Sequence, residues 1–284
     1  MQNPTWIDGT IVDISEAKVS LEDRGYLFGD GVYEVTRIYN SKPFYLGAHL
    51  ARLQRSAAAI RITVPYTNAE IENAVTELIE KSGCTDGYIY MQLTRGSAKR
   101  DHLFPADTKP GMTMYVSALP ALPPLEEIKP VKCITLPDER WLNCHIKTVN
   151  LLPNLLARQK AADAGAQEAI LYRPGDLVTE GTRSNVFAVI EGKVRTHPES
   201  NLILSGITRG IVIDIMTEQA IDFIEEPFTL TEMKTASEIW ITSTTMEVNP
   251  VAAIDERAVN GPAPGQISLR LMKEFRKKIA ADCY

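Results

Sequence analysis

A proline-rich segment in the middle of the chain, LPALPPLEEIKP at residues 119–130, most constrains how this protein can fold. Proline lacks a backbone N–H and fixes φ, so such a run cannot lie inside a helix or a central strand. We therefore predict a small N-terminal α/β domain at 1–118, a linker at 119–130 and a C-terminal domain at 131–284. The length of 284 residues suits one large or two medium domains.

Charge and cysteine content argue against several classes of protein. The chain has 30 basic and 36 acidic residues, and its formal net charge of −6 disfavours a nucleic-acid partner. The 4 cysteines form no C-x-x-C pair, which is typical of reduced thiols and not of a disulfide framework or a zinc site. No signal pattern opens the sequence, and no apolar run approaches the roughly 20 residues of a membrane span. We expect a cytoplasmic protein without a membrane partner.

Hydrophobic periodicity predicts a compact α/β unit before the linker and a strand-rich unit after it. A helix ends at each of two glycines that follow an apolar stripe, and glycine-containing turns separate paired strands. The predicted strands lie at residues 31–39, 43–46, 88–95, 112–119 and 131–136, with paired runs inside 168–181 and 185–197. The predicted helices lie at 46–60, from a cap at Asn68 to Gly83, at 153–164, at 208–219 and in the basic tail after Gly265.

Two residues carry the most informative chemistry. Lys147 lies in RWLNCHIKTVNLLPN among apolar neighbours, where desolvation favours the neutral, nucleophilic amine that forms a Schiff base. Glu180 ends a predicted hairpin strand in TEGTRSN, a suitable position for a carboxylate that pairs with a pyridinium nitrogen. Taken singly, a lysine is more often a snorkelling surface residue, and this glutamate would be a solvated turn residue.

Two hydroxyl-rich turns can bind phosphate. SGITRG opens a predicted helix at Gly206, Ile207 and Thr208, and TSTTMEVNP places Ser243 and Thr244 in a turn after a strand. Backbone N–H groups at such positions bind anions, although each turn alone is also a plain cap. An amine, an acid and phosphate donors are the three requirements of pyridoxal phosphate, which we predict as the cofactor.

Other chemistries fit poorly. The segment Gly29-Asp30-Gly31 begins like a dinucleotide fingerprint, but Glu34 occupies the third glycine position and the segment leads into a strand. There is no G-x-S-x-G elbow and no Walker sequence, and the 4 histidines lack metal-ligand spacing. Hydrolase, kinase and metal-site interpretations are therefore disfavoured.

Together these motifs resemble a known family. EDRGYLFGDGVYEV, the R-x-H of TRGSAKRDH, RWLNCHIKTVNLL, TEGTRSNVF, ILSGITR and TSTTMEVNPV span nearly the whole chain. The combination resembles the fold-type IV pyridoxal phosphate enzymes of the branched-chain aminotransferase-like family, and among them the bacterial D-amino-acid transaminases. The resemblance implies an α+β fold of two domains, the larger with a β-barrel-like sheet, and a homodimer.

The resemblance also implies roles for individual residues. Lys147 would be the Schiff-base lysine and proton shuttle, and Glu180 would pair with the pyridine nitrogen. One departure is Arg183, which stands within a stretch where the family pattern has a run of serines; phosphate, substrate and solvent are all open as its contacts. The further implied cofactor ligands are Arg52, Leu204, Ile207, Thr208 and Thr244, and the implied substrate ligands are Tyr33, Arg100, His102, Ser243 and Thr244.

The implied reaction is a ping-pong transfer of an amino group from a D-amino acid, such as D-alanine, to a 2-oxo acid, either pyruvate or 2-oxoglutarate. A branched-chain L-amino-acid transaminase and an aminodeoxychorismate lyase are alternatives on the same scaffold. A non-catalytic cofactor-binding protein is a third. The side-chain range, the preferred acceptor, a biosynthetic or catabolic role and the dimer itself stay open at this point.

Overall fold

The structure is a computed structural model that describes residues 3–259 and 263–284, and it divides into two compact units. Unit 1 contains Met1–Leu122, Ile146–Asn150 and Ala281–Tyr284, and unit 2 contains Pro123–His145 and Leu151–Ala280. The chain first passes from unit 1 to unit 2 between Leu122 and Pro123, within the proline-rich segment. Because residues 146–150 belong to unit 1, the loop that carries Lys147 is part of the N-terminal fold.

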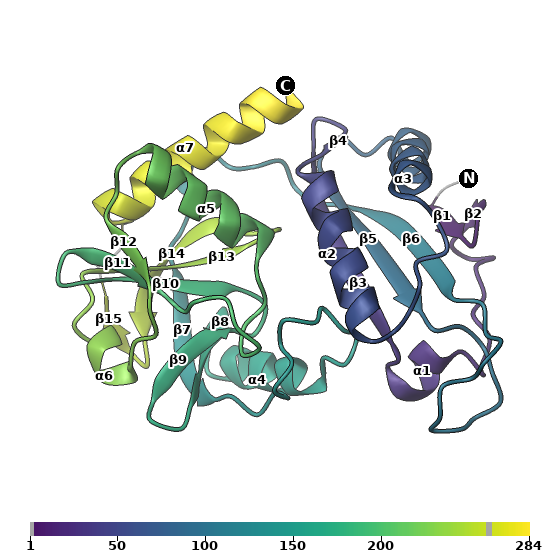
Figure 1. The fold of residues 1–284 in the computed structure, drawn as a ribbon. Coiled ribbons are helices and arrows are strands. Elements are labelled where there is room, and N and C mark those ends of the chain that lie inside the picture. Colours follow the sequence, from purple (N-terminus) through teal and green to yellow (C-terminus); the bar gives the residue numbers. More distant parts are fainter. Residues whose placement is uncertain (1–2, 260–262) are drawn as a thin grey trace. The chain divides into compact units, whose positions relative to one another are not determined.

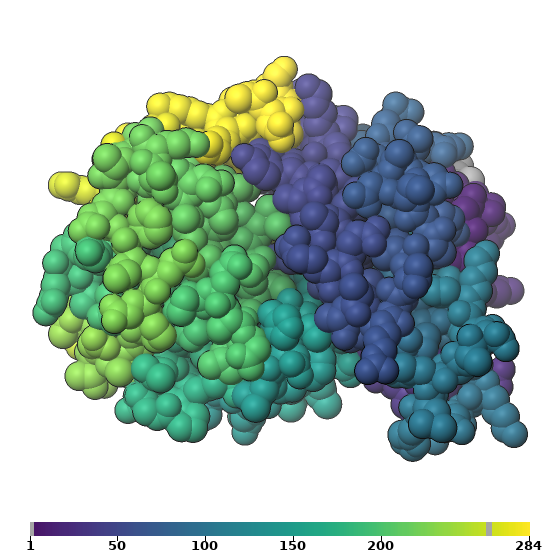
Figure 2. Space-filling model, in the orientation of Figure 1, coloured from purple at the N-terminus to yellow at the C-terminus, as the bar shows by residue number. Residues whose placement is uncertain are grey.

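Unit 1 is an antiparallel sheet of six strands in the order β2-β1-β6-β5-β3-β4. Helices α2 and α3 pack on this sheet, and their side chains cover it from the side seen in Figure 2. Buried Leu50 and Leu53 of α2 join Ile89 and Met91 of β5 in one hydrophobic core. The elements are β1 (Pro4–Ile7), β2 (Thr10–Asp13), α1 (Arg24–Phe28), β3 (Gly31–Tyr39), β4 (Lys42–Pro43), α2 (Leu46–Ala59), α3 (Asn68–Ser82), β5 (Gly87–Thr94) and β6 (Gly111–Ala118).

Most of the predicted elements of unit 1 are confirmed, with two corrections. The strand predicted at 43–46 is wrong, since only Lys42 and Pro43 pair with β3 and the chain turns into α2 through Tyr45, whose φ is 55°. The cap of α3 is Thr67 and not Asn68. Thr67 accepts a hydrogen bond from the Glu70 N–H, and the Glu70 carboxylate accepts one from the Thr67 N–H at 2.7 Å.

Unit 2 is a mixed sheet of nine strands that curls into a half-barrel, as Figure 1 shows. Along its main path the order is β12-β11-β10-β13-β14-β7-β8-β9, and β15 pairs with β14. The elements are η1 (Leu125–Glu127), β7 (Val131–Pro137), α4 (Leu152–Asp163), β8 (Glu168–Arg173), β9 (Leu177–Gly181), β10 (Asn185–Ile190), β11 (Lys193–Thr196), α5 (Ile207–Glu218), β12 (Phe223–Glu225), α6 (Leu230–Met233), β13 (Glu238–Ser243), β14 (Glu247–Ile254), β15 (Arg257–Ala258) and α7 (Gln266–Cys283).

In the sheet of unit 2, the turn after Glu180 and the turn that contains Thr244 each follow the end of a strand. Strand β9 ends at Gly181, directly after Glu180, and β13 ends at Ser243, directly before Thr244. Helix α5 packs on β13, beside the stacked rings of Phe187 and Trp240, whose centroids lie 5.5 Å apart. Among the described residues, no helix is both long enough and apolar enough to cross a membrane.

Candidate active site

Lys147 is fixed by its backbone to strand β3 of unit 1. The Tyr33 N–H donates to the Lys147 carbonyl at 3.0 Å, and the Lys147 N–H donates to the Ser56 hydroxyl at 3.2 Å. The Lys147 Nζ lies 4.2 Å from the centroid of the Tyr33 ring, within the range of a cation–π contact. The structure therefore brings together two of the predicted site residues, the lysine and the tyrosine of β3.

Arg52 is held in the interior of unit 1 by Glu34. Its Nε and Nη2 donate to the two oxygens of this carboxylate at 2.6 and 2.9 Å, and His49 Nδ1 lies 2.8 Å from Oε2. Burial alone would raise the pKa of the Glu34 carboxyl, but Arg52 and His49 hold it well below its usual range. Burial lowers the pKa of His49. A guanidinium has five N–H donors and Glu34 takes two, so Arg52 is an oriented cation.

Arg100 and His102 lie on an exposed loop of unit 1. The Arg100 guanidinium lies 5.1 Å from the centroid of the Phe28 ring, and the His102 ring lies 5.7 Å from the same ring. Within the described part of unit 1, no hydrogen bond or ring contact joins either residue to Tyr33 or Lys147. The assignment of Tyr33, Arg100 and His102 to the substrate carboxylate therefore stays a prediction.

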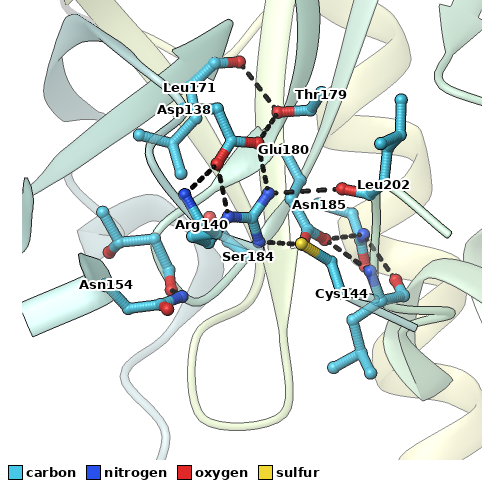
Figure 3. A network of polar contacts seen from close by, with 12 residues as sticks. Asp138, Arg140, Cys144, Asn154, Leu171, Thr179, Glu180, Ser184, Asn185 and Leu202 are labelled. Carbon is cyan, nitrogen blue, oxygen red and sulfur yellow. Dashed lines mark hydrogen bonds and ion pairs between the residues drawn. The ribbon is translucent and has the colours of Figure 1, made fainter. Parts of the chain in front are cut away.

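Glu180 lies in unit 2 at the centre of the polar network shown in Figure 3. Its Oε1 accepts from Arg140 Nη1 at 2.5 Å, and its Oε2 accepts from Asn185 Nδ2 at 2.9 Å and from the Leu204 N–H at 3.0 Å. A carboxylate offers about four acceptor positions. Three are used by described residues, which leaves one for the N–H of a ligand. All three donors are N–H groups, and hydrogen bonds from such donors favour the ionised carboxylate over the protonated acid.

Arg140 connects Glu180 to a second buried carboxylate, Asp138. Arg140 Nε and Nη2 donate to Asp138 at 2.9 and 2.8 Å, and Thr179 Oγ1 also donates to Asp138 at 2.9 Å, as Figure 3 shows. Burial raises the pKa of the Glu180 carboxyl, and Arg140 and the Leu204 N–H oppose that rise. The predicted site residues omitted Asp138, Arg140 and Asn185, although the last two lie inside the motifs that carry the family resemblance.

The start of helix α5 provides N–H groups for an anion beside Glu180. Its N-cap is Gly206, which makes no side-chain cap, and the first helical residues are Ile207 and Thr208. A Cβ at Gly206 would lie 2.1 Å from the Asn185 Oδ1, so only glycine fits this close approach. Asn185 Nδ2 also donates to the Leu204 carbonyl at 2.9 Å. The loop before α5 is thereby tied to Glu180 through the predicted ligand Leu204.

The turn between β13 and β14 carries the remaining predicted ligands of unit 2. The Met246 N–H donates to the Ser243 hydroxyl at 3.2 Å, which closes the turn around Thr244. This turn follows β13, the strand on which α5 packs.

Each unit, taken by itself, holds residue types that pyridoxal phosphate requires. Unit 1 holds an amine in Lys147, and unit 2 holds a buried carboxylate in Glu180 with one open acceptor position. The start of α5, the turn at Thr244 and the oriented Arg52 supply donors of the kind a phosphate dianion needs. The donor set thus covers all three functional groups of the cofactor.

This fold and these residues define an enzyme of the kind that works through a bound pyridoxal-type cofactor. The model of the amino-transferase class IV family matches residues 31–254, and the chain belongs to this family. A D-alanine aminotransferase of Bacillus licheniformis is 43% identical, covering 97% of this chain and 96% of the relative. One of Staphylococcus epidermidis is also 43% identical, with 96% of this chain and 97% of the relative covered.

Solved structures of branched-chain aminotransferases have the same fold. The enzyme of Escherichia coli superposes with a TM-score of 0.89 at 25% identity, covering 98% of this chain and 94% of the other. That of Thermobaculum terrenum, solved in its PLP-bound holo form, gives a TM-score of 0.87 at 29% identity, covering 99% of this chain and 96% of the other. The predicted α+β fold and family resemblance are confirmed.

Proposed function

We propose that this protein is a pyridoxal phosphate-dependent D-amino-acid transaminase. It transfers the amino group of a D-amino acid such as D-alanine to a 2-oxo acid such as pyruvate or 2-oxoglutarate. The observation that carries this proposal is the 43% identity to D-alanine aminotransferases over nearly the full length of both chains. The branched-chain relatives share the fold at 25 and 29% identity, which supports the L-amino-acid alternative less.

Two residues perform the central steps of the proposed reaction. When bound, the cofactor supplies an electron sink for the charge that develops at the substrate Cα. Lys147 Nζ would hold the cofactor covalently and, after the substrate amine has displaced it, would accept the proton from Cα and return it at the cofactor carbon. With the cofactor bound, Glu180 would accept the ring N–H at its open position and would keep the ring nitrogen protonated. Arg52, Ile207, Thr208 and Thr244 bind the phosphate, and Leu204 supports the ring face.

The proposed substrate ligands are Arg100 with His102 on one loop and a set of hydroxyl donors. The Arg100 guanidinium presents a planar donor fork to the α-carboxylate, His102 lies two residues later, and the Tyr33 hydroxyl adds a neutral donor. Ser243 and Thr244 complete the set.

We also propose a homodimer in the cytoplasm. Support comes from large apolar side chains that are exposed in each unit, among them Leu103 at 77% and Leu152 at 66%. Sedimentation equilibrium tests the dimer, and a monomer across micromolar concentrations would contradict it. We keep 1–118 and 131–284 as proposed domains joined by 119–130. Limited proteolysis is expected to cut first within 119–130.

A spectroscopic titration tests the proposed reaction. The visible band of the lysine-bound cofactor is expected to disappear on addition of D-alanine and to return with 2-oxoglutarate. A response to L-leucine alone would support the branched-chain alternative, and turnover without any 2-oxo acid would support a lyase. Lys147→Ala is expected to abolish both the band and turnover. Lys160→Ala, at an exposed lysine of α4, serves as the matched control.

A further inference from the structure

The turn that follows Glu180 is held rigidly by a buried carboxylate, Glu168. Thr182 donates to Glu168 Oε1 from its hydroxyl at 2.5 Å and from its N–H at 3.1 Å, and the Ser184 hydroxyl donates to Oε2 at 2.9 Å. The Gly181 N–H closes the turn on the Ser184 carbonyl at 2.6 Å. Glu168 is fully buried. The two hydroxyls of the turn therefore donate their protons to a buried carboxylate and not to a ligand.

Arg183 is the residue that this turn directs outward. Its side chain is exposed, and its Nη2 lies 3.8 Å from the Met246 sulfur, a weak acceptor that carries no charge. Within residues 3–259 and 263–284, no Asp or Glu oxygen forms an ion pair with Arg183. Met246 belongs to the turn of Ser243 and Thr244, so the guanidinium lies beside both site turns of unit 2.

We propose that Arg183 binds the second carboxylate of dicarboxylic substrates, meaning D-amino acids and 2-oxo acids with a carboxylate at the end of the side chain. This inference rests on the proposed transaminase function. A guanidinium presents a planar fork to a carboxylate, and an unpaired cation on a rigid turn loses little entropy when it binds. The α-carboxylate is assigned to Tyr33, Arg100 and His102, so the distal carboxylate is the group that needs a further cation.

The cofactor phosphate is a second anion that a guanidinium can bind, and the structure favours the substrate. The proposed function already assigns the phosphate to Thr208, Thr244 and Arg52, and the start of α5 offers further N–H groups. The two interpretations differ in what the loss of Arg183 changes. A substrate ligand alters discrimination between donors, whereas a phosphate ligand alters cofactor affinity.

A comparison of two amino donors tests the inference, with 2-oxobutanoate as the common acceptor. In Arg183→Met, the ratio of kcat/KM for D-glutamate to that for D-alanine is expected to fall about tenfold or more, as for loss of a hydrogen bond to a charged group. Arg183→Lys is expected to retain part of the ratio, and Arg183→Ser to lose it. Arg257→Met, at an exposed arginine in the β15 hairpin of the same unit, is expected to leave the ratio unchanged.

An equilibrium measurement separates this inference from the proposed function. Calorimetry on the cofactor-loaded protein compares glutarate with butanoate, which lacks the second carboxylate. Glutarate is expected to bind Arg183→Met about tenfold more weakly than it binds the wild type, a loss that butanoate does not share.

Two outcomes overturn the role of Arg183. One is an unchanged donor ratio together with unchanged glutarate binding. The other is weaker pyridoxal phosphate binding with an equal loss for both donors, which would assign Arg183 to the phosphate. A wild-type protein that turns over no D-amino acid would instead refute the transaminase proposal, and glutarate binding would still decide the role of Arg183.

Discussion

The two units each bury one glutamate against an arginine, yet the two carboxylates differ in how fully they are satisfied. Glu34 in unit 1 accepts from two nitrogens of Arg52, from His49 and from the Val35 N–H. Glu180 in unit 2 accepts from Arg140, Asn185 and the Leu204 N–H, with one position left open among the described residues. The pKa of Glu34 is lowered and that of Glu180 is raised, although burial acts in the same direction on both.

This difference distinguishes Glu34, which only holds Arg52 in place, from Glu180, which keeps an acceptor position for a ligand. A carboxylate with about four donors has no capacity for a ligand, so Glu34 can act only through Arg52, which it orients. A carboxylate with three donors in a buried site keeps one acceptor position and a strong demand for a fourth donor. Burial and an arginine partner are thus common to both carboxylates, and the number of donors is what distinguishes them.

The largest expected effect is on stability when Glu34 is replaced. Glu34→Gln removes the carboxylate charge that pairs with the buried Arg52 guanidinium, and it is expected to lower the free energy of unfolding by about 3–5 kcal/mol. In Glu180→Gln, Arg140 keeps its pair with Asp138, so the expected loss is about 1–3 kcal/mol. Urea unfolding of both cofactor-free variants measures this, and equal losses would remove the distinction between the carboxylates.

The second effect is on turnover when Glu180 is replaced. A carboxamide cannot provide an ionised acceptor for the ring nitrogen, and kcat of Glu180→Gln at saturating pyridoxal phosphate is expected to fall by about 10²–10³-fold. Glu34→Gln is expected to act mainly through weaker cofactor binding, because Arg52 then loses the carboxylate that orients its guanidinium. Steady-state kinetics across cofactor concentrations separates the two, and a Glu180→Gln defect that excess cofactor repairs would contradict the assignment.

A smaller effect is expected on the pH profile when Arg140 is replaced. Burial raises the pKa of Glu180 and Arg140 opposes this, so Arg140→Met is expected to raise that pKa further. The ionised carboxylate then persists only at higher pH, and the acidic limb of the kcat/KM profile is expected to move upward. Arg140→Lys, which keeps the charge, is the control. An unmoved limb in Arg140→Met would show that Asn185 and Leu204 suffice to hold Glu180 ionised.

The smallest effect is on the acid dependence of stability. The folded pKa of Glu34 lies below its ordinary value of 4.5, so its ionised form stabilises the fold fully above that value and progressively less as the pH falls toward the folded pKa. The difference in unfolding free energy between wild type and Glu34→Gln is therefore expected to be constant near neutral pH and to narrow below about pH 4.5. Urea midpoints measured at several pH values test this. A difference that widens in acid would contradict the lowered pKa.

Much of the local structure was predictable because it depends on neighbours in sequence. Apolar spacing predicted α2 and α5 to within a residue at each end, and alternation with glycine turns predicted the hairpins of unit 2. Motif resemblance identified Lys147 and Glu180. The short helix α1 and strands β1 and β2 were not predicted, since they have few residues and weak periodicity. The cap of α3 was misplaced by one residue because Thr67 and Asn68 are both good capping residues, and only the reciprocal bonds with Glu70 distinguish them.

The sequence by itself determined the family and most of the longer helices and strands, and it predicted Lys147 and Glu180 as the two central residues. Only the tertiary structure decided that Lys147 belongs to unit 1. It also decided that Arg140 and Asn185 donate hydrogen bonds to Glu180, and that Glu34 accepts hydrogen bonds from Arg52. The tertiary structure further decided that two hydroxyls of the 181–184 turn donate to the buried Glu168, whereas the Arg183 side chain is exposed. Periodicity and capping depend on residues within a few positions of each other. The satisfaction of a buried charge depends on donors that lie tens of positions apart and meet only when the sheet has formed.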